Sequence, residues 1–343
     1  MASICVIGAG VIGLSTANCL LDHLPDCEVT IVAEKFMDQT TSIGAAGCFG
    51  PKTIFSESFD DILQWSKASW DHFAALNERA KSSTETGVFL INGYEISKNK
   101  EYCQSELLKR SVPNIKRLND VEMKSMFPNF KSGFRYKTFM VDPRYYLPYL
   151  TEQFKSRGGR IIERKVSKLN EDKFLTNFDV IVNCSGLGSR HIADDHRMVP
   201  IRGQTVKVYA PWLQHFIFSD GLYIYPSADG LVTLGGIKQF GSSSMEISGH
   251  DRKYILDGCY TLEPELKKAP IVQEWVGLRP FRPFVRVESE VIKSKQADGE
   301  PMRIVHNYGH GGDGIALSWG TSEQAVKLVM KFLDNLTGFK SKL

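Results

Sequence analysis

The sequence predicts an α/β protein in which a parallel sheet is joined to a second region of antiparallel strands. The chain opens with a β-branched run, a glycine-rich turn and a helical pattern. Strands of the buried type recur at 178–184 and 303–308, each running into a glycine-rich turn. Residues 200–290 instead carry short strands typical of an antiparallel sheet. At 343 residues the length allows two or three domains.

The opening segment has the order and spacing of a dinucleotide-binding unit. The run Ile4–Ile7 leads into Gly8, Gly10 and Gly13, and a helix is predicted to follow. In this motif Gly8 permits the turn, Gly10 lets the backbone approach a pyrophosphate, and Gly13 lets the helix pack on the strand. The amino end of the helix then offers free N–H groups to phosphate. A signal peptide or membrane span is excluded here, because a basic leader is missing and polar residues interrupt the apolar run.

An acidic residue follows the second predicted strand. The run Val29–Ala33 ends at Glu34, which lies 21 residues after Gly13. A carboxylate at this distance accepts hydrogen bonds from a ribose diol, which favours an adenosine without a 2′-phosphate. The complete pattern therefore predicts a Rossmann-like nucleotide-binding domain.

Composition and charge exclude several classes of protein. The net charge of +3 comes from well-mixed signs, so neither a nucleic acid nor a membrane is expected as a partner. Seven scattered cysteines without C-x-x-C spacing indicate reduced, mostly buried thiols. His306 and His310 have a zinc-like spacing, but the glycines around them argue against a helix, so no metal is expected.

The predicted domains are discontinuous. Residues 1–50, 141–200 and 291–343 are assigned to the nucleotide-binding domain, and 51–140 and 201–290 to a substrate-binding domain. A helix is predicted over Thr321–Leu336. The antiparallel strands are predicted at Gln204–Tyr209, Leu222–Tyr225, Leu231–Gly235 and Trp275–Val285.

The last three residues form an address signal. Ser341, Lys342 and Leu343 spell the tripeptide that the peroxisomal import receptor reads at a carboxyl terminus. We therefore expect the import receptor as a partner and the peroxisomal matrix as the location.

Many sequence blocks, in the right order, resemble the FAD-dependent D-amino-acid oxidase family, and within it the D-aspartate oxidases. The resemblance covers nearly the whole chain. The matching blocks are Val6–Ser15, Thr40–Ser42, Ala45–Gly47, Tyr146–Leu150, Asn183–Arg190, Arg202–Gln204, Tyr223–Pro226, Gly277–Pro280 and His306–Gly312.

The resemblance implies FAD as the cofactor and an inserted antiparallel-sheet substrate domain. It also implies that the late glycine-rich loop offers backbone N–H groups to the pyrimidine edge of the flavin, where reduction places negative charge. The residues expected to contact FAD are Gly8, Gly10, Val11, Ile12, Gly13, Glu34, Lys35, Thr40, Thr41, Ser42, Gly47, Cys48, Val166, Ser185, Gly186, Gly311, Gly312, Asp313, Gly314, Ile315 and Ala316.

The resemblance also implies three catalytic residues. Arg279, in the stretch Gly-Leu-Arg-Pro-Phe-Arg-Pro that begins at Gly277, would grip the α-carboxylate of a D-amino acid with two parallel hydrogen bonds. Tyr223 would share that carboxylate, and the backbone carbonyl of Gly312 would accept a hydrogen bond from the amine. For Arg279 and Arg282 the alternative is a surface ion pair, and for Tyr223 it is a packing role.

Other residues bear on which side chain the substrate carries. An acidic substrate needs a second cation. Relatives that act on D-aspartate are expected to place arginines at two positions, where this sequence has Lys238 and Phe218. Lys52 is a further candidate cation. The lid between Phe216 and Tyr223 is short, as in the D-aspartate oxidases that the chain resembles, and this resemblance implies acidic D-amino acids, namely D-aspartate or D-glutamate, as substrates. The expected products are a 2-oxo acid, ammonia and H₂O₂, formed by hydride transfer to FAD and reoxidation by O₂.

Several alternatives stay open. Neutral D-amino acids such as D-alanine, or glycine and sarcosine, are other substrates for the same fold. A nicotinamide-dependent dehydrogenase and a flavin-retaining protein without turnover are other functions. The oligomeric state is open.

Overall fold

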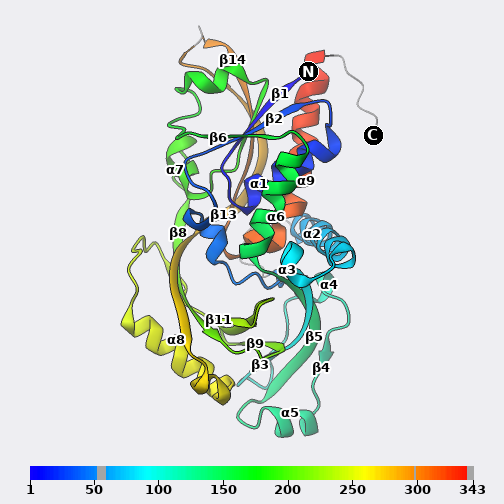
Figure 1. The fold of residues 1–343 in the computed structure, drawn as a ribbon, viewed down its shortest axis with the longest axis vertical. Helices are drawn as coiled ribbons and strands as arrows, with labels where there is room; N and C mark the ends of the chain where they lie inside the picture. The colour runs from blue at the N-terminus through cyan, green and yellow to red at the C-terminus, as the bar shows by residue number, and fades with distance from the viewer. Residues whose placement is uncertain (52–58, 297–298, 338–343) are drawn as a thin grey trace.

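The computed structural model describes residues 1–51, 59–296 and 299–337. In these ranges the chain forms a 14-stranded mixed sheet whose two ends differ in character (Figure 1). The order is β4-β5-β3-β9-β10-β11-β8-β13-β14-β7-β1-β2-β6, and β12 pairs with β8 off this path. Lys52 and the tripeptide Ser341–Leu343 lie outside the described residues.

One end of the sheet is parallel. Its central strand β1 (Ser3–Ile7) pairs in parallel with β2 (Glu28–Ala33) on one side and with β7 (Val180–Asn183) on the other. The outer strands β6 (Arg160–Glu163) and β14 (Pro301–His310) continue the parallel arrangement. The β-branched runs that predicted β1, β2, β7 and β14 are thus confirmed as buried strands.

Long helices cover one face of this parallel part (Figure 1). α1 (Val11–His23) packs against α9 (Gly314–Thr337) and α6 (Pro143–Ser156), and α9 also contacts α2 (Phe59–Arg79). The largest apolar core lies between these helices and the strands. α1 is therefore fixed on both sides, with its amino end at the carboxyl end of β1.

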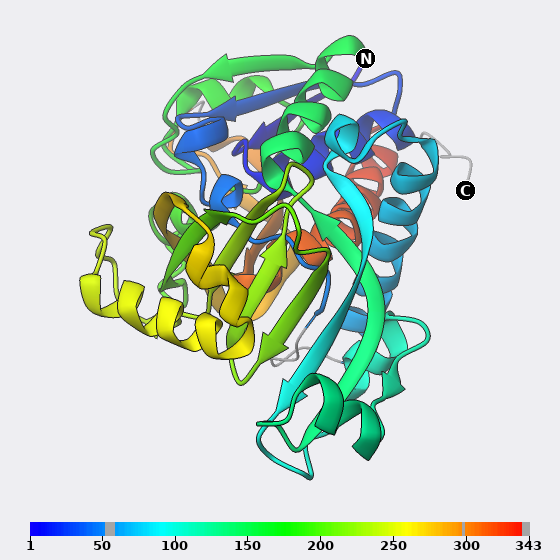
Figure 2. The same cartoon turned by 60° about the horizontal axis from the view of Figure 1, so that its bottom comes forward.

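The other end of the sheet is mostly antiparallel and is covered on its outer face by α8 (Figure 2). α8 (Gly249–Leu262) packs its apolar residues against strand residues such as Val206, Ile224 and Leu234. Because side chains alternate between faces along a strand, the intervening residues point to the opposite face. The strands here are β3 (Val88–Ser97), β4 (Lys116–Arg117), β5 (Ser132–Val141), β8 (Val199–Tyr209), β9 (His215–Ser219), β10 (Leu222–Pro226), β11 (Leu231–Gly235), β12 (Gln239–Phe240) and β13 (Ile271–Lys293).

The remaining short elements lie at the rims. They are η1 (Met37–Gln39), η2 (Thr41–Gly44), α3 (Ser83–Thr86), α4 (Glu106–Ser111), α5 (Asp120–Met126), η3 (Lys173–Asn177), η4 (Gly186–Gly188), α7 (Ser189–Ile192), η5 (Pro264–Lys268) and η7 (Gly311–Asp313).

The structure differs from the sequence prediction in three elements. The last helix begins at Gly314 rather than near Thr321, because the glycine-rich loop itself turns helical through η7. α8 was not predicted within a region expected to be all strand, although Ser248 caps its amino end by accepting a hydrogen bond from the N–H of Asp251 at 3.2 Å. β9 was also missed, and forms a hairpin with β10.

Two other sequence expectations concern cysteines and membrane spans. Four of the seven cysteines, including Cys5 and Cys184, are buried, while Cys103 is exposed. No helix in the described part of the chain has the length and apolar character needed to cross a bilayer. The proposed division into two domains stays a prediction, since β8 and β13 join both parts into one sheet.

Candidate active site

A cavity lies where the parallel and antiparallel parts of the sheet meet. It is bordered by the amino end of α1, the segment 41–50, and the loop leading into α9. Strands β8, β10 and β13 supply the side on the antiparallel part. The predicted site residues that line it are Val11, Ile12, Thr41, Ser42, Gly47, Cys48, Gly186, Tyr223, Lys238, Arg279, Gly311, Gly312, Asp313, Gly314, Ile315 and Ala316.

The glycine-rich turn has the geometry that its sequence predicted. Gly8 has a φ of +108°, a conformation that side-chain-bearing residues rarely adopt. A Cβ on Gly13 would lie 1.9 Å from the carbonyl oxygen of Gly8, so the helix backbone rests directly on the turn. The amino end of α1 therefore reaches the strand end closely enough to present its N–H groups to a phosphate.

Hydroxyl groups from η2 complete this end of the cavity. The N–H of Val11 donates to Ser42 Oγ at 3.0 Å, and the Thr41 hydroxyl donates to the carbonyl of Leu278 at 3.2 Å. Ser42 thus ties η2 to α1, and Thr41 ties it to β13. The Thr40 hydroxyl donates to the backbone carbonyl of Met37 at 2.7 Å.

The residues predicted for the adenosine end surround the carboxyl ends of β1 and β2. Glu34 follows β2, is exposed, and has Lys165 Nζ 3.5 Å from its Oε1. Lys35 is also exposed, whereas Val166 is buried in a small core with β1 and β2. The predicted residues that do not line the cavity are Gly8, Gly10, Gly13, Glu34, Lys35, Thr40, Val166 and Ser185.

Arg279 and Tyr223 both lie over glycines on neighbouring strands. A Cβ on Gly203 would be 2.2 Å from Arg279 Nη1, and a Cβ on Gly235 would be 2.3 Å from the Tyr223 hydroxyl oxygen. Only glycine leaves room for these two side chains to lie flat against the sheet. A Cβ on Gly312 would lie 3.7 Å from Arg279 Cδ. The three residues predicted to be catalytic therefore meet at one side of the cavity.

Neighbouring groups hold Arg279 and Tyr223 in place. Arg279 Nη1 donates to the carbonyl of Ile237 at 3.1 Å. The rings of Tyr223 and Tyr225 are stacked, with centroids 4.6 Å apart. Burial raises the pKa of Tyr223, and the positive charge of Arg279 opposes that shift. The phenol therefore stays protonated at neutral pH and is available as a hydrogen-bond donor.

The two positions expected to contact the substrate side chain differ in polarity. Lys238 lies next to Ile237, is exposed, and borders the cavity. Phe218 also borders it and pairs directly with Tyr223 across the β9–β10 hairpin. The segment between Phe216 and Tyr223, predicted to be a short lid, is a tight hairpin with Gly221 at its turn.

Trp275 and Thr205 border the cavity without having been predicted as site residues. The Trp275 indole lies on two glycines, since a Cβ on Gly44 or on Gly277 would be 2.1 Å or 1.8 Å from its ring. Trp275 shares a strand face with Arg279, four residues away on β13, and this even spacing was a usable signal. Thr205 carried no such signal, because its position depends on the pairing of β8.

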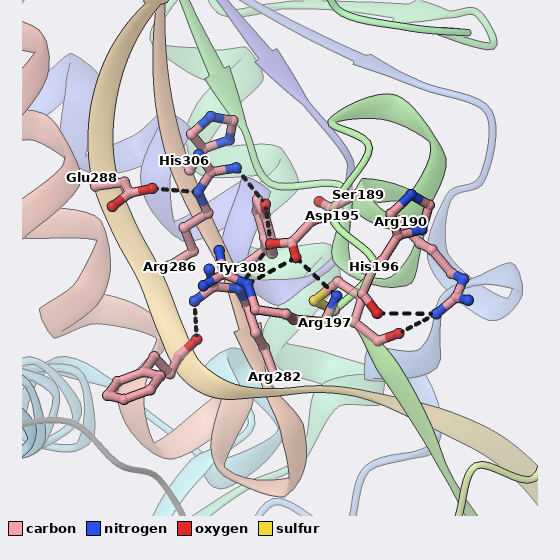
Figure 3. A network of polar contacts seen from close by, with 12 residues as sticks. Ser189, Arg190, Asp195, His196, Arg197, Arg282, Arg286, Glu288, His306 and Tyr308 are labelled. Atoms are coloured by element: carbon pink, nitrogen blue, oxygen red, sulfur yellow. Dashed lines mark hydrogen bonds and ion pairs between the residues drawn. The ribbon is translucent and has the colours of Figure 1, made fainter.

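A buried polar network lies behind the cavity and reaches it through Tyr308 (Figure 3). The Tyr308 hydroxyl donates to Asp195 Oδ2 at 2.9 Å, and Arg282 Nε donates to the same oxygen at 2.8 Å. Burial acts to raise the pKa of Asp195, but these hydrogen bonds outweigh it and lower the pKa from 3.8 to about 2. Arg282 thus forms a buried ion pair, not the surface pair considered from the sequence.

The network continues to the second glycine-rich turn. Arg286 Nη1 donates to the Tyr308 hydroxyl at 2.8 Å, and Arg286 also pairs with Glu290. His306 Nε2 lies 2.7 Å from Glu290, and its Nδ1 lies 3.2 Å from Asn183 Nδ2. His306 and His310 both lie on β14, and His310 instead contacts Thr321 at 3.0 Å. Within the described ranges, no group of three or more possible metal ligands occurs.

Two buried polar atoms at the cavity wall have no partner among the described residues. They are Thr205 Oγ1 and Asn307 Oδ1. A buried polar atom without a partner is costly, so such atoms at a cavity indicate that the cavity holds a polar group. Asn307 lies on the strand that leads into the glycine-rich loop, and together with the turn at Gly8 and the amino ends of α1 and α9 it fits a phosphate-bearing cofactor with polar ring edges.

Comparison with known proteins identifies the family. A family profile described as FAD dependent oxidoreductase matches residues 3–328. The chain belongs to this family. Its cofactor is accordingly FAD, and it is an enzyme of the oxidoreductase class.

Two of the similar sequences are D-aspartate oxidases. The oxidoreductase is 38% identical over 338 residues to the D-aspartate oxidase of Homo sapiens, covering 98% of this chain and 96% of the relative. It is 37% identical to D-aspartate oxidase 1 of Caenorhabditis elegans, covering 97% and 98% of the two chains.

Solved structures share the fold. Glycine oxidase from Geobacillus kaustophilus aligns with a TM-score of 0.75 at 21% identity, covering 100% of this chain and 99% of the other. The FAD-bound L-alpha-glycerophosphate oxidase of Mycoplasma pneumoniae aligns with a TM-score of 0.73 at 16% identity, covering 96% and 95%.

Proposed function

We propose that the oxidoreductase oxidatively deaminates acidic D-amino acids, D-aspartate or D-glutamate, to a 2-oxo acid, ammonia and H₂O₂. The observation that carries this proposal is the meeting of Arg279, Tyr223 and Gly312 beside the flavin-binding loop, with Lys238 at the cavity border. The D-aspartate oxidases among its relatives support the same substrate class.

In the proposed mechanism the chain's own residues bind and orient the substrate. The Arg279 guanidinium and the Tyr223 hydroxyl donate to the α-carboxylate, and the carbonyl of Gly312 accepts from the amine. This fixes the Cα–H direction, and no side-chain base is needed once the amine is neutral. The flavin, when bound, supplies the acceptor for the hydride and returns electrons to O₂. The imino acid product then hydrolyses in water.

The experiment that tests this function is H₂O₂ release by the FAD-loaded protein. D-aspartate, D-glutamate, D-alanine and L-aspartate are compared at equal concentration. Peroxide mainly from the acidic D-isomers supports the proposal. Greater activity on D-alanine would reject the substrate class while keeping the chemistry, and silence from all four would reject oxidase function.

Oxidation of neutral D-amino acids is the second candidate. It is favoured by Phe218, an apolar residue at one of the two positions where a cation was expected, and by the exposure of Lys238. An exposed ammonium contributes less to binding than a buried one, because water screens it.

Lys238→Ala is expected to lower kcat/KM for D-aspartate about two- to fivefold and to leave D-alanine turnover near the wild-type value. The reason is that only the acidic substrate carries a second carboxylate for the ammonium group. Steady-state rates with both substrates check this. Lys238→Arg, which keeps the charge, is the matched control. Equal losses on both substrates would remove Lys238 from the specificity argument.

We also propose that the protein is imported into the peroxisomal matrix through Ser341, Lys342 and Leu343. The proposed production of H₂O₂ is consistent with a peroxisomal location and supports the assignment. A fluorescent protein fused to the amino end should give a punctate pattern that coincides with a peroxisomal marker. Removal of the tripeptide should make it diffuse, and a punctate pattern without the tripeptide would contradict the proposal.

A further inference from the structure

Thr205 is a polar residue at the cavity wall whose hydroxyl has no assigned role. It lies on β8, is only 2% exposed, and borders the cavity. Its Oγ1 has no hydrogen-bond partner in the part of the chain that the structure describes. A buried hydroxyl at a cavity, without a partner, costs free energy unless a bound group satisfies it.

The strand register places Thr205 beside the two glycines that support the candidate carboxylate site. Gly235 on β11 lies directly opposite Thr205. Gly203 lies two residues away on β8 and therefore points to the same face. Directly opposite side chains in a sheet are about 5 Å apart, and neighbours along one face of a strand are about 7 Å apart.

The Tyr223 hydroxyl lies over Gly235, and the Arg279 guanidinium lies over Gly203. A Cβ on Gly235 would be 2.3 Å from the Tyr223 hydroxyl oxygen, and one on Gly203 would be 2.2 Å from Arg279 Nη1. The register therefore places Thr205 on the same face as these two groups, with the glycine under Tyr223 directly opposite it and the glycine under Arg279 two residues away on its own strand. Three hydrogen-bond donors thus line one part of the cavity wall.

The donors are matched to an anion with several acceptor sites. A carboxylate offers about four lone-pair positions to hydrogen-bond donors. Arg279 uses Nη1 for the carbonyl of Ile237 at 3.1 Å, so its donation to an anion depends on the remaining N–H groups. Two hydrogen bonds from Arg279 and one from Tyr223 occupy three of these lone-pair positions. The hydroxyl of Thr205, which has no partner among the described residues, is available for the fourth.

We propose that Thr205 is a third donor to the α-carboxylate of the substrate, and that it acts together with Arg279 and Tyr223. This inference rests on the proposed oxidation of an amino acid, but not on whether that amino acid is acidic. A lost hydrogen bond to a charged group weakens binding by about 10- to 100-fold. Thr205→Val removes the hydroxyl and keeps the branched shape, and Thr205→Ser keeps the hydroxyl.

Equilibrium binding of non-oxidisable carboxylates to the FAD-loaded protein tests the proposal. Propionate carries one carboxylate and succinate carries two, and the flavin absorption spectrum reports their binding. In Thr205→Val we expect the Kd for both to rise about tenfold or more, with Thr205→Ser near the wild-type value. The KM for the amino acid substrate should rise more than kcat falls. The Kd for FAD should stay unchanged.

Thr233→Val is the matched control, since Thr233 is buried on the same face of β11 two residues from Gly235 but does not border the cavity. It should leave both carboxylate affinities unchanged. Unchanged affinities in Thr205→Val, a rise confined to succinate, or a loss of FAD would each overturn the proposal. If the wild-type protein acts only on neutral D-amino acids, the acidic substrate class is rejected and the proposed role of Thr205 is unaffected.

Discussion

Replacing Arg279 with methionine should lower kcat/KM for the D-amino acid substrate by about a hundred- to a thousand-fold. Removing one member of a desolvated, hydrogen-bonded charge pair costs about 2–5 kcal/mol, because the other charge stays buried without a partner. Here that charge is the α-carboxylate, held at a guanidinium that lies flat over Gly203. Steady-state peroxide release measures the effect.

The control for Arg279→Met is Arg252→Met, on the surface of α8. Arg252 is exposed and pairs with Glu274, so its removal should leave kcat/KM near the wild-type value. Arg279→Lys should lie between the wild type and Arg279→Met, because a lysine keeps the charge and loses the two parallel hydrogen bonds. A loss of less than about fivefold in Arg279→Met would place the carboxylate elsewhere.

Asp195→Asn should lower the free energy of unfolding by about 3–5 kcal/mol, since it leaves the buried Arg282 without its counter-charge. Arg282 Nε and the Tyr308 hydroxyl both donate to Asp195 Oδ2, and the amide that replaces it is neutral. Urea unfolding of the FAD-loaded protein at neutral pH measures this loss. The control is Asp194→Asn, because Asp194 forms an exposed ion pair with Lys168. This variant should unfold at the same urea concentration as the wild type.

The same substitution should change the acid sensitivity of the fold. The pKa of Asp195 is lowered from 3.8 to about 2 in the folded protein, so the unfolded chain takes up a proton first. The stabilisation is therefore complete above about pH 4 and is lost as the pH falls toward 2. Asp195→Asn should remove this part of the pH dependence. An identical acid profile in wild type and variant would contradict the assignment.

Local patterns predicted the parallel part of the fold well. The β-branched runs before Gly8 and Glu34 became buried parallel strands, and the glycine spacing matched the observed close approach of helix and turn. α8 was missed although Ile255, Cys259 and Leu262 have helical spacing and pack on the sheet. The start of α9 was placed too late because glycine is a poor helix former in isolation, and here packing on the strands overrides that preference.

The site was predicted mainly at positions that lie inside sequence blocks shared with the family. Arg279 and Tyr223 were named from the family resemblance, and the structure brings them together over glycines of β8 and β11. Trp275 and Thr205 were not named, because their positions depend on which strands pair and in what register. Register is a long-range property that a short sequence window does not contain.

β13 has a consequence for how the chain can be divided. Its 23 residues pair with β8 in the first half and with β14 in the second, so one continuous strand belongs to both ends of the sheet. Cutting the gene at any boundary between the two parts would leave one fragment with an open sheet edge and an exposed core. The two parts should therefore not be obtainable as separately folded proteins, and exchanging one of them between relatives will require exchanging this strand as well.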